Sequence, residues 1–235
     1  MKIFIDAGHN YSGADTGAEG NGLREQDVTY FVSSYLSKYL KDAGFEVKCS
    51  RNKLADNVAA TLNRSINYRY MQANEWKADI FISLHCDSSN DKNARGAHIC
   101  VYNENSTAAR LAKDIMPYLL KIGLEGRSKQ IVERKDLGVL KHTNMPAILI
   151  EMGFITNAEN ARIMRTPDVI AKAIFEGVLS FTGVKNADEE YVSVTDAIAI
   201  LTEKGIISDP EKWYSGTWTD EDFKWLLRKV GTYLR

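Results

Sequence analysis

Short apolar, β-branched runs alternate with longer stretches of helical periodicity along most of this chain. Residues 2–6, 79–85 and 147–151 are the clearest apolar runs, and each is predicted to be a strand. Residues 27–43 and 58–76 lie between the first two runs and are predicted to be helices. Alternation of this kind is typical of a sheet covered by helices on both faces. The sequence therefore predicts an α/β fold.

The same pattern extends through the middle of the chain. Residues 45–50 and 96–102 are predicted strands, and residues 107–122 and 167–182 are predicted helices. Residues 138–140 form a short segment of no assigned type. The last of these helices closes a unit of ordinary size for a single domain.

A polar segment without periodicity, residues 185–190, is the predicted linker between two parts of the chain. It separates a domain of residues 1–184 from a small module of residues 191–235. Within the module, Ser193 and Thr219 each stand three residues before an aspartate, which is the spacing of a capping box at a helix start. The module is therefore predicted to be helical, with two short helices.

The module is too short to build a large core, because a chain of roughly 45 residues buries little apolar surface. We expect it to dock on the domain, to dimerise, or to depend on its aromatic side chains. These aromatics could stack on sugars, but a miniature core is the favoured interpretation. They are Trp213, Tyr214, Trp218 and Trp225.

Charge and composition exclude several classes of protein. The formal net charge of -1 supplies no positive field for nucleic acid, so no nucleic-acid partner is expected. No run of apolar residues is long enough to cross a membrane, and the first residues lack the architecture of a signal peptide. Cys49, Cys86 and Cys100 are odd in number and lack metal-type spacing, so buried free thiols are expected.

Residues that can bind a metal follow three of the predicted strands. His9, His85 and Glu151 each stand at or just beyond the end of an apolar run. In an open α/β sheet, ligands bind beyond the carboxyl ends of the strands, so these side chains should gather at one edge. Two histidines and one carboxylate, with an open fourth position, make a catalytic zinc site. The residues alone leave the carboxylate open between Glu25, Glu151 and Asp87.

Glu25 is a candidate because a glycine-rich loop precedes it. A loop with four glycines between residues 13 and 22 can fold back and bring Glu25 beside His9. The alternative is an acidic residue that favours the start of the following helix through its dipole. Periodicity alone does not separate Glu25 from Glu151.

Six stretches of the chain together resemble the zinc-dependent N-acetylmuramoyl-L-alanine amidases of bacterial cell-wall hydrolases and phage endolysins. They occur in the family's order and extend over nearly all of residues 1–183. The stretches are Ile-Asp-Ala-Gly-His at 5–9, Gly-Leu-Arg-Glu-Gln-Asp at 22–27, Arg-Tyr-Met-Gln-Ala-Asn at 69–74, Ala-Asp-Ile-Phe-Ile-Ser-Leu-His at 78–85, Arg-Gly-Ala at 95–97 and Met-Pro-Ala-Ile-Leu-Ile-Glu-Met-Gly-Phe-Ile-Thr-Asn at 145–157.

The resemblance implies a twisted, mostly parallel sheet of about six strands. It implies that His9, Glu25 and His85 bind Zn2+ and that Glu151 is the catalytic acid/base. The implied reaction is hydrolysis of the amide between N-acetylmuramic acid and L-alanine in peptidoglycan. Glu151 would take a proton from water and pass it to the departing amine.

Three further residues are candidate substrate contacts: Arg69, Asn74 and Asp87. A surface charge and a helix-ending residue are the alternatives for the first two. Asp87 stands where the family often has asparagine, and Cys86 where a small residue is usual. His98 is predicted to be a strand residue.

His142 is predicted to lie in a loop that could line the cleft, and Asn157 is predicted to fix a turn.

Two other functions stay open: a zinc peptidase acting on stem peptides, and a non-catalytic wall-binding protein. The absence of an export signal favours an endolysin over an exported autolysin. We expect residues 191–235 to be a wall-targeting or self-association module. Its seven acidic and six basic side chains disfavour purely electrostatic anchoring to anionic wall polymers.

Overall fold

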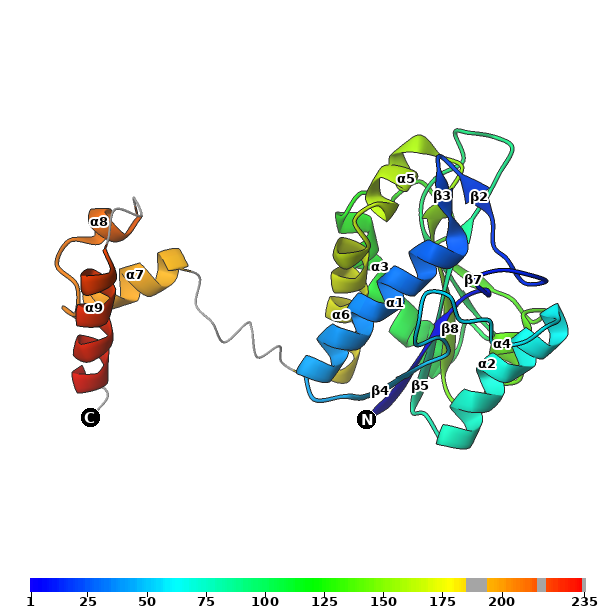
Figure 1. Cartoon of the computed structure of the whole chain (residues 1–235), viewed down its shortest axis with the longest axis horizontal. Helices are drawn as coiled ribbons and strands as arrows, with labels where there is room; N and C mark the ends of the chain where they lie inside the picture. Colours follow the sequence, from blue (N-terminus) through cyan, green and yellow to red (C-terminus); the bar gives the residue numbers. More distant parts are fainter. Residues whose placement is uncertain (185–193, 215–218, 234–235) are drawn as a thin grey trace. The chain divides into compact units, whose positions relative to one another are not determined.

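The computed structural model describes residues 1–184, 194–214 and 219–233 (Figure 1). The chain divides into two compact units, Met1–Val184 and Lys185–Arg235. The strands of the first unit are β1 Lys2–Ala7, β2 Glu19–Gly20, β3 Leu23–Arg24, β4 Glu46–Cys49, β5 Ile80–Asp87, β6 His98–Val101, β7 Ile131–Glu133 and β8 Ala147–Phe154. Its helices are α1 Glu25–Asp42, α2 Leu62–Trp76, α3 Thr107–Lys121, α4 Gly138–Lys141, α5 Ala158–Met164 and α6 Pro167–Thr182.

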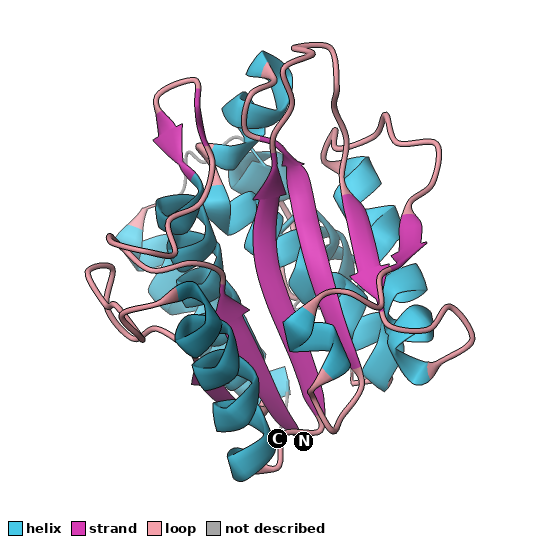
Figure 2. Ribbon diagram, turned by 90° about the vertical axis from the view of Figure 1, so that its right-hand side faces the viewer, coloured by secondary structure: helices cyan, strands magenta, loops and turns pink. Residues whose placement is uncertain are grey.

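A six-stranded sheet in the order β4-β1-β5-β8-β6-β7 forms the centre of the first unit (Figure 2). Four of its five pairings are parallel, and β6 with β8 is the antiparallel pairing. The prediction of a mostly parallel sheet of about six strands is confirmed. Strand β7 was not predicted, because two half-buried residues and one exposed residue leave little apolar pattern to detect.

Helices cover both faces of this sheet, as predicted. Because side chains alternate across a strand, Ile3 and Ile5 enter the core formed with α1, α3 and α6. Phe4 and Phe81 point to the other face, where they pack with apolar residues of α2 and α4. Near-complete burial on both faces explains why β1 and β5 appear as continuous apolar runs in the sequence.

The face that carries α2 becomes polar toward the carboxyl ends of β5 and β8. His85 on β5 pairs with Glu151 on β8, and Glu151 pairs with His98 on β6. Paired residues point to the same side of a sheet. A row of three titratable side chains therefore crosses the sheet just beyond its apolar part.

Several element boundaries differ from the sequence prediction. Helix α2 begins at Leu62 instead of residue 58, because the hydroxyl of Thr61 accepts a hydrogen bond from the backbone N–H of Arg64 and caps the helix there. Residues 138–141 are helical, although no type was assigned to this segment. The hairpin of β2 and β3 and the helix α5 were not predicted. Each element is too short to show a repeat of apolar residues with the period of a strand or of a helix.

The second unit contains α7 Val194–Glu203, α8 Pro210–Tyr214 and α9 Asp220–Tyr233. The described part thus has three helices where two were predicted. The capping box at Thr219 is confirmed: its hydroxyl accepts from the N–H of Asp222, whose carboxylate accepts from the N–H of Thr219. The corresponding box at Ser193 and the predicted linker lie outside the described residues.

A small apolar cluster holds the second unit together. Ile198, Ile206 and Ile207 are buried, and Trp213 packs against them, which agrees with the core interpretation for this tryptophan. Trp225 instead stays 43% exposed. Trp218 and the side chain of Tyr214 lie outside the described residues, so their predictions stay open.

Among the described residues, no helix combines the length and the apolar character needed to span a membrane. Cys49, Cys86 and Cys100 are all free thiols, as predicted. Cys86 and Cys100 are buried, but Cys49 is half-buried, so the prediction of burial is wrong for Cys49.

Candidate metal centre

Three side chains from distant parts of the sequence meet at the carboxyl edge of the sheet. Oε1 of Glu25 lies 3.0 Å from Nε2 of His9 and 3.1 Å from Nδ1 of His85. The two histidine nitrogens are 3.1 Å apart. Among the described residues, these three form the group whose ligand atoms converge closely enough to hold a metal ion. The structure thus brings together the three residues predicted as ligands.

The turn after β1 places His9. Its backbone φ is 69°, a left-handed conformation that is uncommon outside glycine and is often found at functional sites. Gly8, just before it, has no room for a side chain, since a Cβ there would lie 2.5 Å from Cε1 of His85 and 2.5 Å from the carbonyl oxygen of Leu84. The close approach of this turn to β5 therefore requires a glycine.

Glu25 is the first residue of α1, and backbone N–H groups hold its carboxylate in place. Oε2 accepts a hydrogen bond of 2.8 Å from Ala18, and Oε1 accepts one of 2.8 Å from Cys86. The Cys86 N–H is available because Cys86 lies beyond Ala7 and Leu84, the last residue pair of β1 with β5. A Cβ on Gly17 would lie 2.6 Å from Oε2 of Glu25, so the glycine-rich loop folds directly against the carboxylate.

Asp15 supports His9 from behind, a role the sequence prediction missed. Its Oδ1 lies 3.2 Å from Nδ1 of His9, the ring nitrogen turned away from Glu25. The other carboxylate oxygen accepts hydrogen bonds from Ser65 and from Arg69. Carboxylates in this position fix the tautomer and orientation of metal-binding histidines. No periodicity marks Asp15, because it lies in an irregular loop.

The prediction that Arg69 contacts substrate needs correction. Arg69 is 4% exposed. Its Nη1 lies 3.3 Å from the buried carboxylate of Asp6, and its Nη2 lies 3.3 Å from that of Asp15. It is neither a surface charge nor free to reach a ligand in solution. Its charge instead holds Asp15 against His9 through Asp15's second oxygen.

The prediction for Asn74 is also wrong. Its amide group donates to the carbonyl of His142 and accepts from the N–H of Asn144, just before β8 begins. This is the amino edge of the sheet, whereas the candidate ligands lie at the carboxyl edge. The same contact places His142 away from the cleft, with its ring against Tyr70.

Asn157 does fix a turn, because its side chain caps α5 through the N–H groups of Glu159 and Asn160.

Glu151 stands beside the three converging side chains and has an unsatisfied carboxylate. Its Oε2 is buried and has no hydrogen-bond partner among the described residues. Burial raises the pKa of Glu151 to about 8, with further contributions from the charges of Asp87 and Glu25. A carboxyl group that is easily protonated near neutral pH can both accept and donate a proton.

Beyond Glu151, a second polar group is formed by Asp87, His98 and Arg127. Nη2 of Arg127 donates to Oδ2 of Asp87 at 2.8 Å and lies 2.9 Å from Nδ1 of His98. His98 is the first residue of β6, so its prediction as a strand residue is confirmed. Arg127 was not singled out from the sequence, since it lies in a loop without a recognisable pattern.

The donor set and its geometry fit a zinc ion. Ligand atoms about 2.0–2.2 Å from a tetrahedral ion lie roughly 3.3–3.6 Å apart. The three distances of 3.0 to 3.1 Å here require only a small outward movement. Burial lowers the pKa of His9, but Asp15 and Glu25 outweigh this effect and raise it to about 9. Burial lowers the pKa of His85. Burial would raise the pKa of Glu25, but His85 and His9 outweigh this effect and hold the pKa of Glu25 well below its usual range.

Replacing Asp15 tests whether it orients His9 for metal. We expect Asp15→Asn to weaken zinc binding about 10- to 100-fold, the usual effect of removing the outer hydrogen-bond partner of a histidine ligand. Competition with a chromophoric chelator measures this affinity. Asp136→Asn is a matched control, because Asp136 is exposed and its ion pair is with Arg134, away from the candidate ligands. Equal affinities of the two variants would contradict the role of Asp15.

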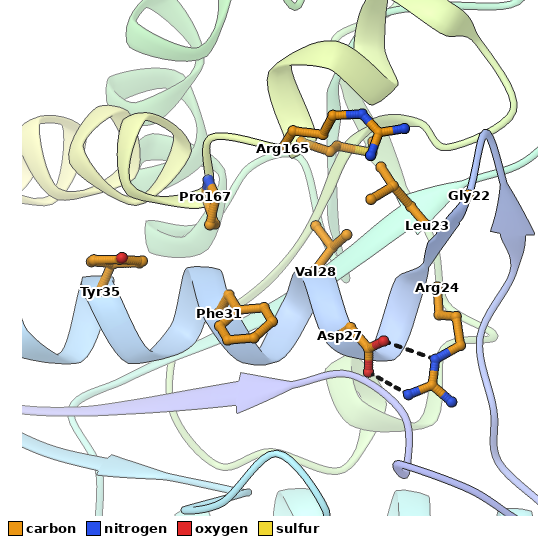
Figure 3. Close-up of a pocket in the computed structure, with 10 residues that line it drawn as sticks. Gly22, Leu23, Arg24, Asp27, Val28, Phe31, Tyr35, Arg165 and Pro167 are labelled. Atoms are coloured by element: carbon orange, nitrogen blue, oxygen red, sulfur yellow. Dashed lines mark hydrogen bonds and ion pairs between the residues drawn. The ribbon is translucent and has the colours of Figure 1, made fainter.

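A separate groove of about 790 Å3 runs along α1 (Figure 3). Phe31 and Tyr35 line it, and its charged end is closed by the ion pair of Arg24 with Asp27. None of the residues predicted for the site lines this groove. Its polar pair is already satisfied, and we assign it no chemistry.

Comparison with known proteins agrees with this architecture. Residues 3–180 match the family described as N-acetylmuramoyl-L-alanine amidase. The chain is 34% identical over 184 residues to the uncharacterized protein YqiI of Bacillus subtilis (strain 168), covering 76% of this chain and 84% of YqiI. It is 31% identical over 186 residues to the N-acetylmuramoyl-L-alanine amidase LytC of the same organism, covering 76% of this chain and 35% of LytC.

A solved structure shows the same fold. The N-acetylmuramoyl-L-alanine amidase from Clostridium difficile 630 superposes with a TM-score of 0.66 at 28% identity, covering 78% of this chain and 97% of that one. Fold and site define an α/β protein with a potential His2Glu metal site and a free carboxylate at the carboxyl edge of a mixed sheet. The chain belongs to the N-acetylmuramoyl-L-alanine amidase family. The match ends at residue 180, before the second unit.

Proposed function

We propose that this protein hydrolyses the amide bond between N-acetylmuramic acid and L-alanine in peptidoglycan. The observation that carries the proposal is the convergence of His9, Glu25 and His85 next to Glu151, whose buried carboxylate oxygen has no partner among the described residues. Membership of the N-acetylmuramoyl-L-alanine amidase family indicates which bond is cut. One relative is named an N-acetylmuramoyl-L-alanine amidase, LytC, and another, from Bacillus phage SPP1, is named an endolysin, which supports a role as an autolysin or an endolysin.

His9, Glu25 and His85 would hold Zn2+ in this protein. When bound, the ion supplies a Lewis acid that polarises a carbonyl group and lowers the pKa of water. Asp15 keeps the His9 ring turned toward the other two ligands, and the N–H groups of Ala18 and Cys86 keep the Glu25 carboxylate in place. The surrounding protein thus fixes the orientation of the donor atoms in advance.

Glu151 would move the proton in the reaction. Its carboxylate accepts a proton from the attacking water and delivers it to the amide nitrogen, so that L-alanine leaves as a neutral amine. A pKa of about 8 before metal binds shows how strongly the surroundings favour the protonated carboxyl, and a nearby cation would lower it toward neutrality. The site therefore suits a group that must be a base first and an acid second.

Analysis of the released products tests this function. We expect digestion of purified peptidoglycan to free peptides that begin with L-alanine and to leave intact muramic acid on the glycan. New amino termini elsewhere in the stem would instead support the zinc peptidase. Wall binding without any new amino terminus, in protein that contains zinc, would support the non-catalytic alternative.

The charge states at the site predict that zinc binding at pH 7 releases one proton from His9 and part of another from Glu151, whose pKa of about 8 a nearby cation lowers. His9, with a pKa raised to about 9, is protonated in the metal-free protein and must lose this proton to bind metal. Glu25 is already ionised and His85 already neutral, because their pKa values are lowered. Zinc affinity should therefore rise with pH until about pH 9. Titration calorimetry in buffers of different ionisation enthalpy counts the protons, and a buffer-independent heat would contradict the prediction.

Residues 191–235 stay a predicted wall-targeting or self-association module. Phe223 and Leu227, one turn apart on α9, are 46% and 57% exposed, and neighbouring exposed apolar side chains are suited to a contact surface. Deletion of residues 185–235 tests both versions. Reduced pelleting of the truncated protein with walls would support targeting. A fall in the molecular mass measured by light scattering that exceeds the mass of the deleted residues would support self-association. If neither changes, both versions are wrong.

A further inference from the structure

Arg127 bridges the outer end of the site. It lies between α3 and β7, and its guanidinium reaches Asp87 of β5 and His98 of β6. The guanidinium carbon also lies 5.0 Å from the ring centre of Phe154 at the end of β8. One side chain thus contacts β8, which carries Glu151, and both of its neighbours, β5 and β6.

The order of strands places Arg127 on a defined side of Glu151. His9 follows β1, His85 belongs to β5, Glu151 to β8 and His98 to β6, and these strands are neighbours in that order. The candidate metal ligands therefore lie on the β1 and β5 side of Glu151. Arg127 comes from the loop before β7, on the β6 side of the sheet, and reaches across β8 to Asp87 of β5, and its charge acts on Glu151.

Part of the guanidinium is available to a ligand. Its Nη2 and Nε are used by Asp87 and His98, whereas no hydrogen bond involving Nη1 is found in the described part of the chain. The side chain is 35% exposed. Nδ1 of His98 accepts from Nε of Arg127 and Oδ2 of Asp87 accepts from Nη2, so the guanidinium plane is fixed before a ligand arrives. A fixed guanidinium with free N–H groups is suited to a carboxylate.

The proposed reaction tells which part of the substrate comes near Arg127. Glu151 must deliver a proton to the amide nitrogen, so the departing peptide starts at Glu151. With the candidate ligands on the β1 and β5 side, the peptide extends toward β6, where Arg127 contacts His98. The residue after L-alanine in a stem peptide is a D-glutamate linked through its side chain. It therefore carries a free α-carboxylate, or the carboxamide that replaces it, one residue beyond the cut.

We propose that Arg127 is a specificity-determining residue that binds the α-carboxylate of the second stem-peptide residue through Nη1. This inference rests on the proposed amidase function. It predicts that the protein prefers stem peptides with a free carboxylate over those with a carboxamide at this position. A charge-assisted hydrogen bond of this kind corresponds to roughly a 10- to 100-fold preference in kcat/KM.

Two synthetic substrates provide the test: muramic acid linked to L-alanyl-D-glutamate and its D-isoglutamine counterpart. Release of the free dipeptide is measured for the zinc-loaded wild type and for Arg127→Ala, Arg127→Lys and Lys129→Ala. Lys129 lies in the same loop but is 62% exposed and pairs with Glu104, so its replacement should leave both rates unchanged. Zinc content and circular dichroism of each variant report on the metal site and the fold.

We expect Arg127→Ala to lose most of the preference for the carboxylate substrate and Arg127→Lys to keep part of it. An equal fall for both substrates would show that Arg127 only supports Asp87 and His98, and it would overturn the proposal. The same conclusion follows if the wild type cuts both substrates equally well. If the wild type frees no dipeptide from either substrate but cuts the stem elsewhere, the amidase function itself fails, and the inference about Arg127 fails with it.

Discussion

Glu151→Gln is expected to lower kcat about 10²- to 10⁴-fold while the protein keeps its zinc, because glutamine has the shape of glutamate but cannot carry the proton. Glu151 is not among the three residues whose ligand atoms converge, so its replacement leaves the donor set intact. Metal analysis should give one zinc per chain in both proteins. Turnover of purified walls near the wild-type rate would remove Glu151 from the reaction.

The same variant should be more stable than the wild type when metal is absent. The folded protein holds a proton on Glu151 up to about pH 8, whereas the unfolded chain releases it near the ordinary value of 4.5. Stability conferred by the protonated carboxyl is therefore complete below about pH 4.5 and is lost as the pH rises through 8. Glutamine has no charge to bury at any pH. In a chelator, the Tm advantage of the variant should be small at pH 5 and largest above pH 8.

A constant Tm difference over this pH range would contradict the raised pKa of Glu151. It would leave the kinetic prediction untouched, because the kinetic loss depends on the missing proton carrier and not on the stability of the fold. The two measurements on a single variant thus separate the chemical role of Glu151 from its cost to the folded state.

His85→Ala is expected to abolish both zinc binding and activity. His85 lies within 3.1 Å of both other candidate ligands, so its loss leaves two donors that cannot close the site. Zinc at 1,000 times its Kd should stabilise the wild type by about 4 kcal/mol, since it binds only the folded state. The variant should show no such rise in the free energy of unfolding.

His142→Ala is the matched control for this experiment. His142 lies at the amino edge of the sheet, where its carbonyl and its ring make contacts away from the candidate ligands. The His142→Ala variant should bind one zinc ion per chain and keep its activity. Zinc-dependent stabilisation of His85→Ala equal to that of the control would place the metal elsewhere.

The sequence is sufficient to predict the layers of the fold and two of the three candidate ligands. Strands buried on both faces must be apolar throughout, so β1, β5 and β8 are visible as runs, and a polar residue at the end of such a run stands out. His9 and His85 could be singled out on this basis. Elements with little burial, such as β7 and the β2–β3 hairpin, leave no such trace.

The choice of carboxylate depends on tertiary structure. The residues left Glu25, Glu151 and Asp87 open, and the family resemblance assigned Glu25 to the metal. In the fold, Gly17 and the N–H of Cys86 let Glu25 reach both histidines. Oε2 of Glu151 has no hydrogen-bond partner in the described part of the chain, and Asp87 pairs with Arg127. These contacts join residues up to 61 positions apart in the chain, and no local pattern encodes them.

Tertiary structure also decided which charged and polar residues serve the site. Arg69 and Asn74 belong to one motif on α2, yet Arg69 lies against Asp15 and Asn74 lies at the opposite edge of the sheet. Five residues of helix extend about 7.5 Å along the axis, so neighbours in a motif can serve different ends of a domain. Asp15 and Arg127 lie in loops, where sequence has no period. The sequence by itself thus determined the fold class and the residue types at the strand ends, and the packing of loops against those ends determined which side chains meet.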